Sequence, residues 1–168
     1  MKFKTGIITE SFRKPVREAL RMAKELGADG VQMYAVKGDV SPEINAAARK
    51  DLVTFIRALD LEISALCGDL GGHGFAVAKD NPAKIERSKR IVDLAVDLGT
   101  NIVTTHIGVI PSDKKHERYA VLRDACGELA KYAAAKGVTF AIETGPETAA
   151  VLKAFLDDIG SKGIGANL

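Results

Sequence analysis

The feature that most constrains this chain is a regular alternation of short apolar runs with longer amphipathic segments. Six runs of strand length, most of them rich in Val, Ile, Thr or aromatic residues, begin near residues 5, 31, 61, 101, 138 and 163. Five intervals separate the first start from the last, so the average spacing is about 32 residues, the size of one strand–helix unit. Strands that alternate with helices predict a parallel sheet with helices packed outside it.

The segments between the runs carry the signals of helix starts and ends. A helix is predicted from Pro15 to Leu26, where apolar residues recur at helical spacing between Arg and Lys. Capping residues and early prolines place the later helix starts at Ser41-Pro42-Glu43, Asp80-Asn81-Pro82, Ser112-Asp113 and Pro146-Glu147. Glycines that suit a left-handed cap end four of the five helices, at Gly27, Gly99, Gly137 and Gly160.

These elements predict a single α/β domain over residues 1–168, with two possible architectures. An open, doubly wound parallel sheet of five or six strands fits this length. A closed (β/α)8 barrel typically needs about 250 residues, whereas this chain holds five strand–helix units and the opening of a sixth strand. A barrel is therefore expected here only as a partial barrel.

Composition removes several functional classes. With 24 Lys and Arg against 22 Asp and Glu, the formal charge of +2 gives no general case for binding nucleic acid or an anionic membrane. No stretch approaches the roughly 20 apolar residues of a membrane span, and the basic start lacks the apolar region of a signal peptide. Cys67 and Cys126 match neither a disulfide framework nor a zinc motif. We expect a cytoplasmic, thiol-reduced protein.

In either fold the working face is the carboxyl edge of the strands, where several polar residues gather. In chain order, the residues predicted at that edge are Glu10, Ser11, Tyr34, Cys67, Asp69, His73, His106, Glu143, Glu147 and Asn167. Their carboxylates and imidazoles are expected to converge on one site.

Glu143 and His106 are the strongest candidates in this set. Glu143 ends the apolar run Val-Thr-Phe-Ala-Ile, and a carboxylate there is costly to bury unless it is paired, protonated or bound to metal. His106 ends Ile-Val-Thr-Thr and is open to metal ligation, to substrate hydrogen bonding or to a structural role as a core histidine.

The remaining candidates each keep a structural alternative. The loop from Gly68 to Gly74 is either a phosphate cradle of backbone N–H groups or a mobile loop, and His73 within it is either a ligand or a solvated side chain. Cys67 suits an apolar wall better than a nucleophile because no partner base is indicated. Glu10 and Glu147 are candidate substrate-binding groups or solvated carboxylates.

Four strand ends together carry a resemblance. They are Ile-Thr-Glu-Ser-Phe at 8–12, Ser-Ala-Leu-Cys-Gly-Asp-Leu-Gly-Gly at 64–72, Thr-His-Ile-Gly at 105–108 and Ala-Ile-Glu-Thr-Gly at 141–145. In this order they resemble the sugar phosphate isomerase/epimerase family of the xylose-isomerase-like barrel superfamily, which also contains the family-2 AP endonucleases. The resemblance covers the whole chain, strand by strand.

The resemblance implies a barrel enzyme that uses Mn²⁺, Mg²⁺, Co²⁺ or Zn²⁺ on a sugar or sugar phosphate. Glu143 matches the family glutamate that ends strand five, which is both a metal ligand and the acid/base that moves a proton beside a carbonyl. His106 matches the strand-four histidine that lines the substrate site or binds metal, and His73 falls near a strand-three histidine. Glu10, Cys67 and Glu147 are expected to line the substrate site.

The resemblance also implies that something is missing. The family's next metal ligand is an Asp just after Asn-Leu on strand six, and this chain ends at Asn167-Leu168, so the ligands of strands seven and eight are absent as well. A barrel truncated there has open sheet edges, which we expect to pair with a second copy or with a missing C-terminal part. The competing interpretations are a non-catalytic α/β module and, within the superfamily, repair of abasic DNA, which the near-neutral charge disfavours.

Overall fold

The structure, a computed structural model, describes residues 3–168. Within them strands and helices alternate along the chain. The strands are β1 (Gly6–Ile8), β2 (Gly30–Tyr34), β3 (Glu62–Cys67), β4 (Ile102–Thr105), β5 (Thr139–Glu143) and β6 (Ile164–Asn167). The α-helices are α1 (Val16–Glu25), α2 (Ala46–Ala58), α3 (Asn81–Leu98), α4 (Glu117–Ala135) and α5 (Ala149–Ile159), and two short 3₁₀ helices are η1 (Thr9–Phe12) and η2 (Ala78–Asp80).

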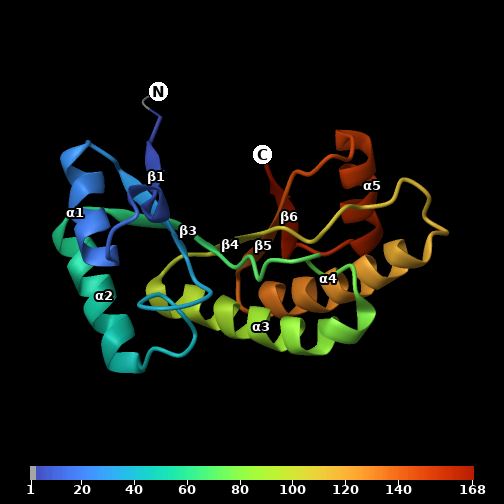
Figure 1. The fold of residues 1–168 in the computed structure, drawn as a ribbon, viewed down its shortest axis with the longest axis horizontal. Helices are drawn as coiled ribbons and strands as arrows, with labels where there is room; N and C mark the ends of the chain where they lie inside the picture. The colour runs from blue at the N-terminus through green and yellow to red at the C-terminus, as the bar shows by residue number, and fades with distance from the viewer. Residues whose placement is uncertain (1–2) are drawn as a thin grey trace.

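The strands pair in the order in which they occur along the chain. All five pairings are parallel, from β1 with β2 to β5 with β6. A doubly wound sheet reverses its direction of growth part-way along the chain, and this sheet does not. The helices lie around the outside of the curved sheet (Figure 1), as right-handed crossovers require. The partial (β/α)8 barrel is therefore confirmed, and the doubly wound alternative is wrong.

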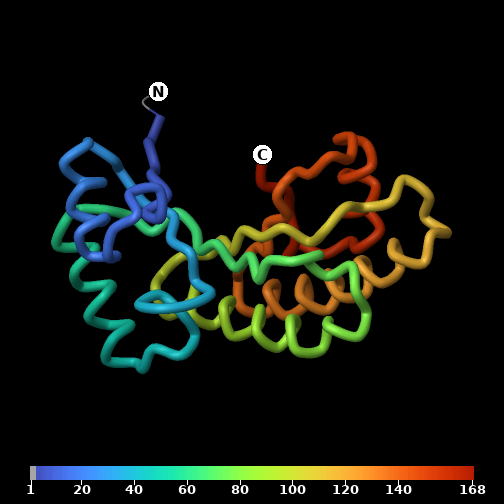
Figure 2. The backbone as a smooth tube through the Cα atoms, viewed as in Figure 1, coloured from blue at the N-terminus to red at the C-terminus, as the bar shows by residue number. Residues whose placement is uncertain are grey.

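The sheet is not closed. In the described residues β1 pairs only with β2, and β6 pairs only with β5. The backbone trace shows the first and last strands standing apart from each other (Figure 2). Each of these two strands therefore keeps one edge whose N–H and C=O groups no other strand of this sheet meets.

The core lies between the sheet and the helices. Alternate strand residues point outward and are almost completely buried, among them Val31, Met33, Leu66, Val103 and Phe140. The helices meet them with apolar side chains that are also fully buried, including Leu20, Ile91, Leu94, Leu122, Leu129 and Phe155. Burial of these side chains fixes which face of each strand points inward, and so fixes the residues that reach the inner face and its carboxyl rim.

The starts and ends of the strands and helices can be compared with those predicted from the sequence. Each strand begins within one residue of the predicted start, and the four predicted cap glycines have φ between 60° and 83°. Three helix starts are wrong, because the side chains that cap α2, α4 and α5 are Asn45, His116 and Thr148. The predicted cap Ser41 instead donates from its hydroxyl to the Gly38 carbonyl at 3.1 Å, in the turn that precedes α2.

Two further observations bear on chemistry. Cys67 and Cys126 are both buried and free of a disulfide. In the part of the chain that the structure describes, no helix combines the length and apolar character needed to cross a bilayer.

Candidate functional site

One row of positions on the inner face of the sheet carries the candidate site. Strand register aligns Cys67 with Thr104 and Thr104 with Ala141. Two residues beyond these three positions come Asp69 and His106, which lie just after the ends of β3 and β4, and Glu143, the last residue of β5, which is itself aligned with Asn167 on β6. Four neighbouring strands thus each place a polar residue in this row at the carboxyl edge.

His106 lies between two carboxylates of this row. Its Nδ1 is 3.1 Å from Asp69 Oδ2, and its Nε2 is 3.5 Å from Glu143 Oε2. The side chains of His106 and Glu143 are 56% and 41% exposed, whereas that of Asp69 is 24% exposed. The two strongest candidates from the sequence, His106 and Glu143, are therefore brought together and open to solvent, with Asp69 on the other side of the His106 ring.

Cys67 and Tyr34 are aligned with each other across β3 and β2, next to the row. Burial raises the pKa of the Cys67 thiol and so favours the neutral thiol, and the predicted place of Cys67 in the wall of the site stays a prediction. The Cys67 sulfur, once ionised, would repel a negative charge on the Tyr34 oxygen, and this effect, followed by burial, raises the pKa of Tyr34. Tyr34 is 41% exposed and presents its ring at the edge of the site.

Glu10 is tied into the backbone at the start of the sheet. Its Oε1 accepts a hydrogen bond from the Tyr34 amide at 3.0 Å, and its Oε2 accepts one from the Thr9 hydroxyl at 2.9 Å. These contacts join the end of β1 to the end of β2. Glu10 is therefore more than a solvated carboxylate, and its predicted contact with substrate stays a prediction.

Glu147 forms a hydrogen bond within the loop that follows β5. Its Oε1 accepts a hydrogen bond from the Gly145 amide at 2.9 Å, and its Oε2 is buried without a hydrogen-bond partner. It does not begin the fifth helix as predicted, because α5 starts at Ala149. Its predicted role toward substrate is untested.

The glycine-rich loop after β3 is anchored to the segment after β4. The Phe75 amide donates to the Ile107 carbonyl at 2.8 Å, and the Gly71 amide donates to Asp69 Oδ1 at 2.8 Å. These contacts anchor the loop, and its two alternatives, a phosphate cradle and a mobile loop, both stay predictions. His73 within this loop is exposed, and its backbone carbonyl, which accepts from the Ala76 amide, makes the contact that holds the turn.

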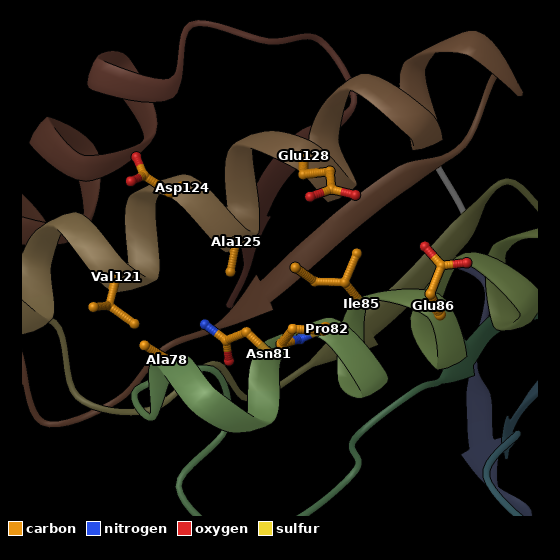
Figure 3. A pocket seen from close by; sticks show the side chains of 9 residues that line it. All are labelled: Ala78, Asn81, Pro82, Ile85, Glu86, Val121, Asp124, Ala125 and Glu128. Atoms are coloured by element: carbon orange, nitrogen blue, oxygen red, sulfur yellow. The ribbon is translucent and has the colours of Figure 1, made fainter.

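A cavity of about 460 Å³ lies elsewhere, between α3 and α4 (Figure 3). Apolar side chains such as Ile85 and Val121 line it together with Glu86, Asp124 and Glu128. None of the residues predicted for the site lines this cavity. The chemistry of the strand ends and the hollow of the helical layer are therefore separate features.

The facing atoms of His106 and Glu143 suit a divalent cation. An imidazole nitrogen and a carboxylate oxygen that share a tetrahedral metal at about 2.0–2.2 Å lie about 3.4 Å apart, close to the 3.5 Å between Nε2 and Oε2. No group of three or more His, Cys, Asp or Glu side chains that could hold a metal occurs within residues 3–168. The pair thus supplies two donors of a site that needs more.

Asp69 is the residue whose role the sequence missed. It was visible as one of several polar residues at the edge, without a partner. Two signals pointed to it: it stands two residues beyond Cys67, the last residue of β3, and Gly71 follows two residues later, the spacing of an Asx turn. Its contact with His106 spans 37 residues of sequence, and only the register of the sheet brings the two together.

Comparison with known families identifies the fold. A family model described as "Xylose isomerase-like TIM barrel" matches residues 20–168. This chain belongs to the xylose isomerase-like TIM barrel family. The resemblance seen in the strand-end motifs is confirmed by this match, which covers β2 to β6 and hence the whole Asp69–His106–Glu143 row.

Solved structures place this xylose isomerase-like chain among larger barrels. It is similar to a xylose isomerase domain protein from Planctomyces limnophilus, with 21% identity, a TM-score of 0.84, and coverage of 98% of this chain and 62% of that one. It is also similar to a structure of L-ribulose 3-epimerase, with 21% identity and a TM-score of 0.77, over 97% of this chain and 59% of that one. A third similar structure is a xylose isomerase-like barrel protein from Mycobacterium smegmatis in complex with magnesium. Its identity is 17% and its TM-score 0.73, over 99% of this chain and 64% of that one.

The chain spans about three-fifths of the length of these structures. At such identities the similarity shows the shared fold alone. No curated protein sequence matches the chain.

Proposed function

We propose that this chain carries the proton-transfer half of a divalent-metal-dependent sugar or sugar-phosphate isomerase/epimerase site. The observation that carries the proposal is the pair of His106 Nε2 and Glu143 Oε2, which face each other at 3.5 Å at the carboxyl ends of β4 and β5. Family membership and the epimerase among the similar structures support the reaction class. The proposed substrate is a small sugar or sugar phosphate.

Glu143 is the acid/base of the proposed reaction. Its carboxylate accepts the proton from the carbon beside the substrate carbonyl, and the electron pair left behind moves onto the carbonyl oxygen to give an enediolate. Return of a proton to the opposite face of the same carbon gives the epimer, and return to the neighbouring carbon gives the isomer. A carboxylate has two oxygens, so one can face His106 while the other receives the proton.

A bound divalent metal would supply positive charge that makes the C–H beside the carbonyl more acidic and stabilises the enediolate. His106 and Glu143 would hold it from this chain. Mn²⁺ and Mg²⁺ prefer several oxygen donors, so further ligands must come from water, from substrate, or from residues outside those described here. The row leaves His106 and Glu143 exposed, which gives such ligands access.

The complete reaction therefore belongs to a complete site. We propose that residues 1–168 form one α/β domain and that the inner face between β1 and β6 is completed by further strands, from the same protein or from a second copy. Non-catalytic assembly is the alternative, and it predicts no metal binding at the row.

The test is substitution of Glu143 by Gln, which keeps the size of the side chain and removes its charge and basicity. We expect calorimetric titration to show Mn²⁺ binding to the wild type and at least a tenfold weaker affinity for Glu143→Gln. With a panel of ketoses and ketose phosphates in D₂O, we expect the wild type to exchange the proton beside the carbonyl and the variant to lose that exchange by 10²-fold or more.

The matched control is Glu25→Gln, which removes an exposed carboxylate at the end of α1. It should leave both Mn²⁺ affinity and exchange unchanged. Binding or exchange that survives Glu143→Gln would show that the site has been assigned to the wrong residue.

A further inference from the structure

The carboxylate of Asp69 is divided between two partners. Its Oδ1 accepts a hydrogen bond from the Gly71 amide at 2.8 Å, and its Oδ2 lies 3.1 Å from Nδ1 of His106. The first contact fixes the orientation of the carboxylate. The second then presents Oδ2 to the imidazole as a hydrogen-bond acceptor. Each carboxylate oxygen of Asp69 therefore has its own partner.

The loop that carries Asp69 is built to hold this arrangement. Gly74 packs so closely on the segment after His106 that an added Cβ would lie 2.2 Å from the carbonyl carbon of Ile107. Gly108 packs equally closely on the loop after β3, since an added Cβ there would lie 2.7 Å from the backbone oxygen of His73. Side chains at these two positions would push the loop after β3 away from the segment after β4, and Asp69 away from His106.

The geometry sets the position of the proton on a neutral His106. Ionised carboxylates only accept hydrogen bonds, and of the two that face His106 only Asp69 lies at hydrogen-bond distance, 3.1 Å from Nδ1 against 3.5 Å between Nε2 and Glu143, so Nδ1 carries the proton. A neutral imidazole has one N–H, and Nε2 is then left with a lone pair. That lone pair faces Glu143 Oε2 at 3.5 Å. Two acceptors facing each other favour a cation between them.

We propose that Asp69 is a positioning residue that holds His106 as the Nδ1–H tautomer and so makes Nε2 a ligand directed at the same point as Glu143. The inference rests on the proposed function for what Nε2 binds, but not for the position of the proton. Carboxylates that orient a histidine in this way commonly change metal affinity 10–100-fold when they are removed.

The variant Asp69→Asn tests the assignment because its outcome has a definite direction. The Gly71 amide still needs an acceptor, so the Asn oxygen stays at the Oδ1 position and the NH₂ group occupies the Oδ2 position. An NH₂ group donates, so Nδ1 of His106 must become an acceptor and the proton must move to Nε2. A carboxylate-to-amide change next to a histidine is known to favour the wrong tautomer in this way.

The chain contains its own reference for the measurement. His116 Nδ1 accepts a hydrogen bond from the Arg118 amide at 3.1 Å, so a neutral His116 carries its proton on Nε2. With three histidines in the sequence, long-range ¹H–¹⁵N spectra at about pH 8.5, where imidazoles are ordinarily neutral, resolve every ring. We expect His106 and His116 to show opposite tautomers in the wild type and the same tautomer in Asp69→Asn.

The matched control is Asp113→Asn. Asp113 Oδ1 accepts from the Lys115 amide at 2.9 Å in a similar local turn, without a contact to His106. It should leave the spectrum of His106 unchanged. The inference is overturned if wild-type His106 carries its proton on Nε2 or on both nitrogens, and equally if Asp69→Asn leaves the proton on Nδ1. The wild-type spectrum alone is decisive if the variant does not fold.

Titration with Zn²⁺ separates this inference from the function on which it rests. If Asp69→Asn inverts the tautomer and weakens Zn²⁺ affinity by 10–100-fold, both are supported. If the tautomer inverts and neither protein binds Zn²⁺, the proposed metal site fails while the role of Asp69 stands. If wild type and variant bind Zn²⁺ equally, Asp69 does not prepare His106 for metal and the second half of the inference is wrong.

Discussion

Outside the site, Glu43 shows how hydrogen bonds from neighbouring side chains shift the pKa of an acid. The two terminal guanidinium nitrogens of Arg87, Nη1 and Nη2, donate to its carboxylate, and Arg90 adds a contact at 3.0 Å. Hydrogen bonding to Arg87 lowers the pKa of Glu43 to about 2. The pair joins the turn before α2 to α3, so its ionisation is linked to the packing of two elements.

The sign of this linkage gives a prediction for Glu43→Gln. A lowered pKa means that the ionised form stabilises the folded state above the ordinary value of 4.5, and that this contribution is lost as the pH falls toward 2. We expect urea unfolding to show the variant less stable than the wild type near neutral pH, with the two converging at about pH 2. The difference should be small because the pair is solvent-exposed.

A control variant, Glu25→Gln, should follow the wild-type curve at every pH, since Glu25 shows no such contact among the described residues. A constant difference between wild type and Glu43→Gln from neutral to acid pH would mean that ionisation of Glu43 contributes nothing.

At the scale of elements, the close approach of two loops governs the site. Gly74 and Gly72 both have positive φ, but a Cβ at Gly74 would collide with the Ile107 backbone, whereas a Cβ at Gly72 meets nothing within 4 Å. Gly72→Ala should therefore cost about 1–2 kcal/mol, the strain of the left-handed conformation alone. Gly74→Ala should cost clearly more in urea unfolding and should also broaden or shift the His106 resonances. Equal losses for the two variants would show that the loops do not depend on this contact.

The strands and helices differ in how well the sequence alone predicts them. Strand positions and glycine caps were predictable because apolar composition and left-handed backbone are local properties, as at Gly27 and Gly160. Three helix starts were not, because Asn45, His116 and Thr148 cap α2, α4 and α5 further along the chain than the predicted signals. The pairing of His106 with Asp69 depends on strand register across 37 residues, which no local signal encodes.

For the whole molecule, the open sheet is the dominant fact. β1 and β6 each leave one edge unpaired within the described chain, and Ile8 on β1 is 42% exposed. Unpaired edges favour association with another strand. We expect this chain on its own to self-associate at micromolar concentration in sedimentation velocity.

A double variant, Ile8→Lys with Ala166→Lys, should return the chain toward its monomer mass of 17.9 kDa, because charged side chains on edge strands oppose pairing. The control Val96→Lys introduces the same charge at a 46% exposed apolar residue of α3 and should leave association unchanged. A wild type that sediments as a well-behaved monomer would contradict the association.

The sequential strand order has a consequence for how such a chain is made. Every strand pairs with the one synthesised just before it, so each strand–helix unit can dock as it leaves the ribosome, without waiting for a distant partner. The sheet then grows in one direction, and its newest strand is always the exposed edge. In this structure β6 holds that place, and Asn167 on it already stands beside Glu143. Growth in this direction would assemble the row in the order Asp69, His106, Glu143, with the contact between His106 and Asp69 in place before Glu143 arrives.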